Sequence, residues 1–115
     1  MTEEAAIFQT QNDFLAAMTM TPAGDWRPTA GVSLRFRRSA RETHLQLLLA
    51  PERRYPGMLQ QLLQRRFLEA ETLADCYLSI NERREVMLCC PLPAADAERR
   101  LAISKLWRLA GLAPL

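Results

Sequence analysis

Histidine, cysteine and glycine are scarce in this chain of 115 residues, and their scarcity excludes several kinds of site. His44 is the only histidine, and the three cysteines, Cys76, Cys89 and Cys90, show no CxxC spacing. Zinc sites and disulfide frameworks need several such residues at defined spacings. The four glycines are scattered, so no glycine-rich phosphate-binding loop is present. We therefore expect neither a metal nor a cofactor.

The sequence also shows no arrangement of residues that is typical of a catalytic site. Cysteine catalysis needs a thiolate beside a base such as an imidazole, whereas Cys89 and Cys90 lie in an alternating apolar segment that is typical of small core residues. Adjacent strand residues point to opposite faces, so these two thiols cannot chelate one ion. The acidic pair Glu3–Glu4 lies at the terminus, where rigid positioning is not expected. The sequence thus predicts a protein that is not an enzyme.

Long apolar runs and a recognisable export signal are absent as well. No run approaches the roughly 18 residues of a membrane-spanning helix, and the acidic N-terminus lacks the basic and apolar regions of a signal peptide. Hydrophobic residues make up 49% of the chain and charged residues 24%, as in soluble globular domains. We therefore expect a single cytoplasmic domain over residues 1–115.

Hydrophobic periodicity predicts the elements of the first half. Helix-compatible spacing over residues 3–18 predicts a helix. Proline and glycine recur over residues 19–31, which predicts a loop; whether its tryptophan fills the core or lies exposed stays open. Alternation over residues 32–37 and 44–49 predicts two antiparallel strands, joined by a polar turn at residues 39–42.

A leucine-rich helix is predicted to begin near Pro56, because proline suits the first helical turn. Five apolar residues are expected to form its core-facing stripe, namely Leu59, Leu62, Leu63, Phe67 and Ala70. Arg65 and Arg66 are expected to face water and to form ion pairs with Glu69 and Glu71 along the helix.

Two short strands and a last helix complete the pattern. Residues 76–80 and 86–90 alternate around a predicted turn at residues 81–83. Helical spacing over residues 94–110 predicts a last helix, for which Gly111 is well placed as the C-terminal cap. Its core-facing stripe consists of Ile103, Leu106, Trp107 and Ala110. The predicted fold class is α+β, a small antiparallel sheet packed with three helices.

Apolar residues on both faces of the second strand pair suggest more apolar surface than one small core needs. The remainder would suit a homodimer or a protein partner. The candidate protein-binding residues are Leu48, Met87, Leu88, Cys89, Leu106 and Trp107. The alternative, in which all of them belong to one monomer core, stays open.

Arginine pairs recur along the chain. Fourteen of the fifteen basic residues are arginine, although the formal net charge is only +2. The five pairs begin at Arg37, Arg53, Arg65, Arg83 and Arg99. They permit three interpretations: a solvated mixed-charge surface, a docking patch for an acidic protein, or a nucleic-acid-binding face, which would require the pairs to converge.

Three segments occur in an order that is typical of one protein family. They are the run Met58-Leu59-Gln60-Gln61-Leu62-Leu63, the strand Cys76-Tyr77-Leu78-Ser79-Ile80, and the segment from Glu85 to Pro93, before the helix that contains Trp107. With these segments the chain resembles the small chaperones of bacterial type III secretion over residues 57–112. The resemblance implies an α+β fold that commonly forms homodimers. It also implies binding of an extended segment of a secreted effector.

The chain differs from these chaperones in two respects, and both differences favour one subgroup. The chain is slightly basic, whereas such chaperones are usually acidic, and its first half shows two clear strands instead of three. It is similar to the HrpV-like regulatory proteins of Hrp secretion systems. This similarity implies a protein-binding regulator whose partner is a transcriptional activator or a chaperone-like co-regulator. A class I-type effector chaperone and a nucleic-acid-binding module remain the alternatives.

Overall fold

The structure of the protein is a computed structural model in which residues 6–38 and 43–113 are described. The first half contains β1 (Ala6–Phe8), α1 (Gln11–Met20), β2 (Ala23–Thr29), β3 (Val32–Arg38) and β4 (Thr43–Leu49). The second half contains a short 3-10 helix (Pro51–Arg53), α2 (Met58–Leu68), β5 (Tyr77–Ile80), β6 (Val86–Pro91) and α3 (Asp96–Leu109). The turn expected at residues 39–42 and the start of the helix expected at residue 3 lie outside the described ranges.

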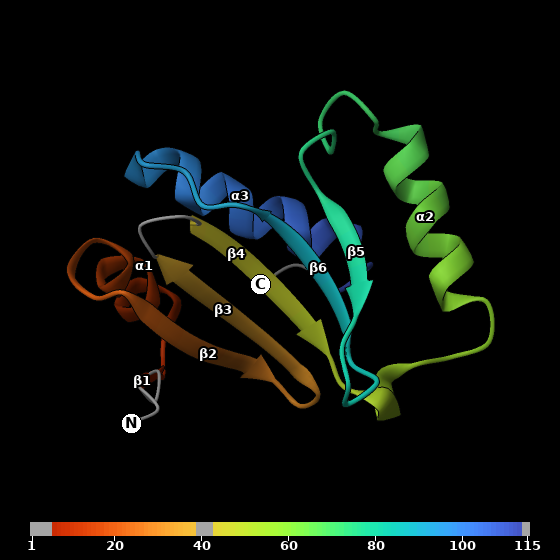
Figure 1. Ribbon diagram of the computed structural model, residues 1–115, viewed down its shortest axis with the longest axis horizontal. Helices are drawn as coiled ribbons and strands as arrows, with labels where there is room; N and C mark the ends of the chain where they lie inside the picture. The colour runs from red at the N-terminus through yellow and green to blue at the C-terminus, as the bar shows by residue number, and fades with distance from the viewer. Residues whose placement is uncertain (1–5, 39–42, 114–115) are drawn as a thin grey trace.

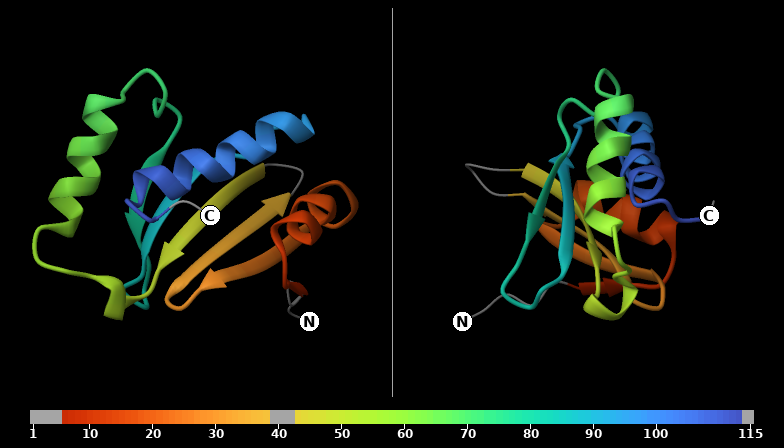
Figure 2. Two further views of the ribbon diagram at one scale, coloured as in Figure 1. Left: turned by 180° about the vertical axis from the view of Figure 1, so that it is seen from behind. Right: turned by 90° about the vertical axis from the view of Figure 1, so that its right-hand side faces the viewer.

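Six strands form one mixed sheet in the order β1-β2-β3-β4-β6-β5. β1 and β2 are parallel, while the other neighbouring strands are antiparallel. Figures 1 and 2 show α1 and α3 on one face of the sheet, with α2 beside β5 at one end. One sheet packed with three helices confirms the predicted α+β class, and the parallel β1 is an addition that the sequence pattern did not predict.

The core lies between the sheet and the two helices that cover it. Successive side chains of a strand face opposite sides, so alternate residues of the central strands point inward. The fully buried ones include Leu34, Phe36, Leu45, Leu47 and Leu88. Burial of each such side chain contributes about 1.5–3 kcal/mol. The alternation in the sequence therefore correctly predicted the inward faces of β3, β4 and β6.

Residues 23–29 form β2, so the prediction of a loop is wrong for this segment. Trp26 is buried, and its ring centroid lies 5.8 Å from that of Phe14. Pro28 is tolerated because β1 pairs only with residues 24–26 and because the register with β3 is irregular beyond Trp26. Proline lacks the N–H of a strand ladder and is confined to edges and bulges. Along the chain, three strands therefore lie between α1 and α2, one more than predicted.

The first helix begins later than predicted. Thr10 is its N-cap, and the Oγ1 atom of Thr10 accepts a hydrogen bond of 3.1 Å from the backbone N–H of Asp13. Such a cap satisfies a backbone donor that has no partner within the helix. The residues before the cap, Ala6–Phe8, pair with β2 as a strand. Ile7, which was expected on the helix, is therefore a half-exposed strand residue.

The last helix, α3, agrees with the prediction to within two residues at each end. Its buried stripe contains all four predicted residues, namely Ile103, Leu106, Trp107 and Ala110. Gly111 follows the helix with a φ of +74°, and its N–H donates to the carbonyl of Arg108 at 3.0 Å. The N–H of Leu112 donates to the carbonyl of Trp107 at 3.4 Å. These two bonds form a Schellman motif, which favours glycine at this position.

One side chain organises the turn between β5 and β6. The Oδ1 atom of Asn81 accepts hydrogen bonds of 3.0 Å from the N–H groups of Arg83 and Glu85. Asparagine commonly closes turns in this way by binding backbone groups a few residues ahead. The predicted hairpin turn is confirmed.

Candidate protein-binding surface

The outward face of α2 and its C-terminal end carry several exposed apolar side chains, next to exposed glutamines such as Gln64. The exposed apolar residues are Leu63, Phe67, Leu68 and Ala70. Phe67 and Leu68 are the most exposed of them, at 78% and 74%. Met58 and Leu62 are the buried residues of the helix. The prediction that Leu63, Phe67 and Ala70 face the core is therefore wrong, because α2 buries a narrower stripe than its leucines suggested.

Arginine side chains help to hold α2 against its neighbours. The Nη1 atom of Arg65 donates to the carbonyl of Leu109, in the last turn of α3, at 2.9 Å. The Nε atom of Arg66 donates to the carbonyl of Cys76, just before β5, at 2.6 Å. Both bonds have a charged donor, which makes them stronger than neutral ones. Two side chains that were predicted to face water thus anchor the helix.

The ion pairs predicted along α2 are replaced by a pair between helices. Glu69 pairs with Arg108 of α3, with 2.8 Å between its Oε1 atom and the Nη2 atom of the arginine. Within the described residues, neither Arg65 nor Arg66 forms an ion pair with a carboxylate. Polar contacts therefore link the C-terminal turns of α2 and α3 and leave the outward face of α2 uncovered.

β5 is the last strand of the sheet, so one side of its backbone has no neighbouring strand in the described chain. Tyr77 and Ile80, at its two ends, are 53% and 49% exposed. The strand lies at the same end of the molecule as α2 (Figure 1). Five of the nine large hydrophobic side chains exposed in the described residues belong to these two elements. We call Leu63, Phe67, Leu68 and Ile80 the α2–β5 surface; Tyr77 pairs with Cys89 and points to the opposite face of the sheet.

The six residues predicted to bind protein are all buried or partly buried, namely Leu48, Met87, Leu88, Cys89, Leu106 and Trp107. Leu88, Leu106 and Trp107 belong to the hydrophobic core. Leu48 and Cys89 are buried on the other face of the sheet, because they alternate with core-facing neighbours. A partner would reach the five buried residues only after a local opening, whereas Met87 is partly exposed. Their role in binding stays a prediction, and the exposed apolar side chains lie elsewhere.

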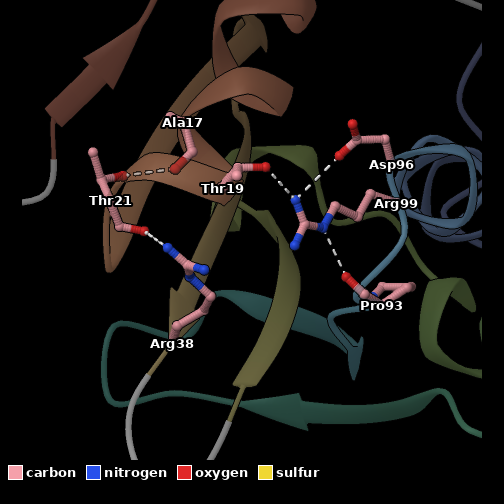
Figure 3. Close-up of polar contacts among 7 residues, drawn as sticks. All are labelled: Ala17, Thr19, Thr21, Arg38, Pro93, Asp96 and Arg99. Carbon is pink, nitrogen blue, oxygen red and sulfur yellow. Dashed lines mark hydrogen bonds and ion pairs between the residues drawn. The ribbon is translucent and has the colours of Figure 1, made fainter.

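Several arginines of the recurring pairs are used inside the fold (Figure 3). Arg99 is only 6% exposed; its Nε atom donates to the carbonyl of Pro93 and its Nη1 atom to the hydroxyl of Thr19, both at 2.7 Å. The Nη2 atom of Arg38 donates to the carbonyl of Thr21 at 2.7 Å. These contacts tie α1 to α3 and to β3. A solvated surface is therefore the wrong interpretation for Arg99 and Arg38.

Metal and membrane sites have no counterpart in the described ranges. Residues 6–38 and 43–113 contain no group of three or more His, Cys, Asp and Glu side chains that could hold a metal ion. None of the helices in these ranges has the length and apolar character needed to cross a membrane. Burial raises the pKa of the Cys89 thiol, which disfavours the thiolate that nucleophilic chemistry needs.

Comparison with known proteins gives one match. A profile of the HrpV family, described as HrpV-like, matches residues 1–114 and so covers nearly the whole chain. No curated protein and no solved structure matches the chain significantly. The match includes the segments that build the core and those that carry the α2–β5 surface, whereas the fold similarity to secretion chaperones stays a prediction.

Proposed function

Because the chain belongs to the HrpV-like family, we propose that it is a non-enzymatic regulator of a bacterial type III secretion system that acts by binding other proteins. Family membership associates it with secretion systems of the Hrp type. The partner that we propose is a transcriptional activator, a chaperone-like co-regulator, or both. The observation that supports binding is the exposed α2–β5 surface.

The α2–β5 surface suits two common modes of protein recognition. Leu63 and Phe67 are four residues apart and lie side by side on the helix, so an apolar groove or helix of a partner can cover both. Covering apolar surface contributes about 25 cal/mol per Å². The outer side of β5, which has no neighbouring strand in the described residues, suits pairing with an extended segment of a partner.

The way in which α2 is held supports the same role. Arg65 and Arg66 fix the orientation of the helix from its inner side. Their hydrogen bonds cover none of the outward apolar side chains. A helix that is fixed in place but exposed on its outer face needs little reorganisation when a partner binds, which preserves affinity.

Phe67→Asp tests this surface directly. In a pull-down from the native bacterial cytoplasm, analysed by mass spectrometry, the wild-type protein should retain a transcriptional activator or a chaperone-like co-regulator. The variant should recover at least about tenfold less of it, because a charge replaces a large apolar contact and tenfold corresponds to only about 1.4 kcal/mol. Met20→Asp is the matched control, since Met20 is 82% exposed and lies on α1, away from α2.

Two outcomes of this experiment would contradict the proposal. If Phe67→Asp retains the partner as well as the wild type does, the α2–β5 surface is not the binding site. If Met20→Asp loses the partner equally, the effect is not specific to that surface. Sedimentation of both variants also shows whether a second copy of the chain occupies the surface, because a homodimer would dissociate only in Phe67→Asp.

The position of β5 as the last strand of the described sheet favours a second candidate, a class I-type effector chaperone. In that case the main protein recovered would be a secreted effector bound through its N-terminal segment. A nucleic-acid-binding module is the candidate from a different class, and it predicts affinity that falls steeply with salt. The use of Arg38, Arg65, Arg66 and Arg99 within the fold leaves fewer arginines for such a role. Absence of DNA or RNA binding at low salt would exclude it.

A further inference from the structure

Cys76 and Cys90 face each other across the β5–β6 hairpin. Tyr77 pairs with Cys89 in the antiparallel register, so the next positions along, Cys76 and Cys90, lie opposite one another. Both thiols are free, and the two residues are 1% and 2% exposed within the same core cluster. Direct interaction between the two thiols has the largest influence on the pKa of each.

The backbone spacing at this position suits a disulfide. Near the turn, the N–H of Asn81 donates to the carbonyl of Glu85 at 3.2 Å, which marks a hydrogen-bonded position of the ladder. Hydrogen-bonded and non-hydrogen-bonded pairs alternate along antiparallel strands. Cys76 and Cys90 lie five positions from the Asn81–Glu85 pair, an odd number, so they form a non-hydrogen-bonded pair. The Cα atoms of such pairs lie about 4.5 Å apart. Disulfides form at Cα separations of about 4.4–6.8 Å.

A groove gives small molecules access to Cys90, one member of this pair. It has a volume of about 270 Å³ and is lined by residues of the loop before β5, of β6 and of α3, among them Asp75, Cys90, Leu101 and Lys105. A water molecule occupies about 30 Å³ in the liquid, so a peroxide of similar size fits. The ammonium group of Lys105 lies 3.3 Å from the carboxylate of Asp75, at the side of the groove next to Cys76.

We propose that Cys76 and Cys90 are a redox-active pair that closes to an intramolecular disulfide when hydrogen peroxide is present. In the first step the thiolate of one cysteine of the pair attacks one oxygen of the peroxide. An S–O bond forms, the O–O bond breaks, and the departing hydroxide takes up the proton that this thiol released, to become water. In the second step the sulfur of the other cysteine attacks the oxidised sulfur, the S–O bond breaks, and the leaving hydroxide takes the proton of the second thiol. Two thiols are oxidised and one peroxide is reduced to two water molecules.

Each thiol acts on the pKa of the other, so the two titrate as a pair. The interaction with Cys90 lowers the pKa of Cys76, and Lys105 acts in the same direction, against burial and Asp75. The same interaction with Cys76, followed by burial, raises the pKa of Cys90. The thiolate is the reactive form and Cys90 lines the groove, so either sulfur can be the first to react with peroxide.

The disulfide would fasten the edge strand of the sheet to its neighbour. β5 has only β6 beside it, and the carbonyl of Cys76 accepts the hydrogen bond from Arg66 of α2. Oxidation would thus restrict the strand that carries Tyr77 and Ile80. The consequence for partner binding, though not the disulfide itself, rests on the proposed function.

The test treats the folded full-length chain with hydrogen peroxide and then alkylates all remaining thiols in denaturant. Peptide mass mapping should find Cys76 joined to Cys90 and Cys89 alkylated. The Tm of the oxidised protein should rise by on the order of 5–10 °C, because the bond shortens the free loop of the unfolded chain. Cys89→Ala should behave in the same way, whereas Cys76→Ser and Cys90→Ser should form no bridge. In each of these two variants, a sulfenic acid should be trapped on the cysteine of the pair that remains.

Three results would overturn the proposal. One is that all three cysteines are still alkylated after peroxide treatment. Another is that the bridge includes Cys89 or joins two chains. A third is that the bond forms only in denaturant. No partner protein takes part in this experiment, so its outcome is independent of whether the α2–β5 surface binds one.

Discussion

At the β2–β4 end of the molecule, α1 and α3 cover the sheet, and Phe14, Leu34 and Phe36 are completely buried between them. At the α2–β5 end, Phe67 and Leu68 project into solvent, and α2 is held partly by hydrogen bonds from arginine side chains to backbone carbonyls. Burial of apolar area is the main source of folding free energy. The comparison indicates that the first region carries most of the stability and that the second is available for binding.

The buried arginine of the first region sharpens the contrast. Arg99 is itself buried among α1, α3 and the loop before α3, where removal of its guanidinium would break two part-buried hydrogen bonds that link these elements. Arg66 lies at the margin of the second region, where water can replace part of what is lost. Substitutions in the two regions should therefore differ in magnitude, and three variants measure the difference.

The largest effect is expected from Leu88→Asp, which should abolish folding. Leu88 is fully buried in the middle of β6, and an unpaired carboxylate at such a site costs several kcal/mol or more, against a total stability of about 5–15 kcal/mol. Circular dichroism during heating should show no cooperative transition. Leu63→Asp, at an exposed position of α2, is the matched control and should melt like the wild type. A cooperative transition in Leu88→Asp would contradict the assignment of the core.

An intermediate effect is expected from Arg99→Met. The substitution keeps the apolar stem but leaves the carbonyl of Pro93 and the hydroxyl of Thr19 without their charged donor, which should lower the free energy of unfolding by about 2–4 kcal/mol. Urea denaturation measures this change. Arg100→Met, one residue further on the exposed side of α3, should change stability by less than about 0.5 kcal/mol. Equal effects of the two substitutions would show that Arg99 is not a structural link.

The smallest effect on global stability is expected from Arg66→Met, at about 1 kcal/mol, because a single partly exposed hydrogen-bonding group is lost. Its local effect should be larger: amide hydrogens of α2 should exchange faster, while those of β3 and β4 should not change. Hydrogen-exchange mass spectrometry resolves the two regions. Gln64→Met, on the exposed side of α2, serves as the control. Uniformly faster exchange throughout the chain would show that α2 belongs to the same cooperative unit as the core.

Local patterns in the chain were sufficient for much of the fold. A stripe of apolar residues at helical spacing and a terminal glycine predicted α3. The alternation of apolar and polar residues predicted β3, β4, β5 and β6. Those elements bury one face against neighbours, so their sequence repeats with the period of the structure. β1 and β2 were missed because their pairing partners, and not their own composition, make them strands, as Pro28 within β2 illustrates.

The candidate site was less predictable for a related reason. Periodicity shows that α2 is amphipathic, yet Leu62 is buried and Leu63 is exposed, although both are leucines of the same helix. The width of the buried stripe depends on how closely the neighbouring elements approach. Likewise, adjacent arginines are indistinguishable in sequence, whereas Arg99 is buried and Arg100 lies exposed.

The sequence by itself determined the fold class, the positions of most strands and helices, and the inward faces of the central strands, because these depend on the order of apolar and polar residues along a short segment. Only the tertiary structure decided which apolar side chains of α2 remain in solvent, which arginines reach backbone carbonyls, and that Cys76 lies opposite Cys90. Each of those results depends on where a distant part of the chain comes to lie. Contacts between distant residues have no periodic signature that a single sequence can show.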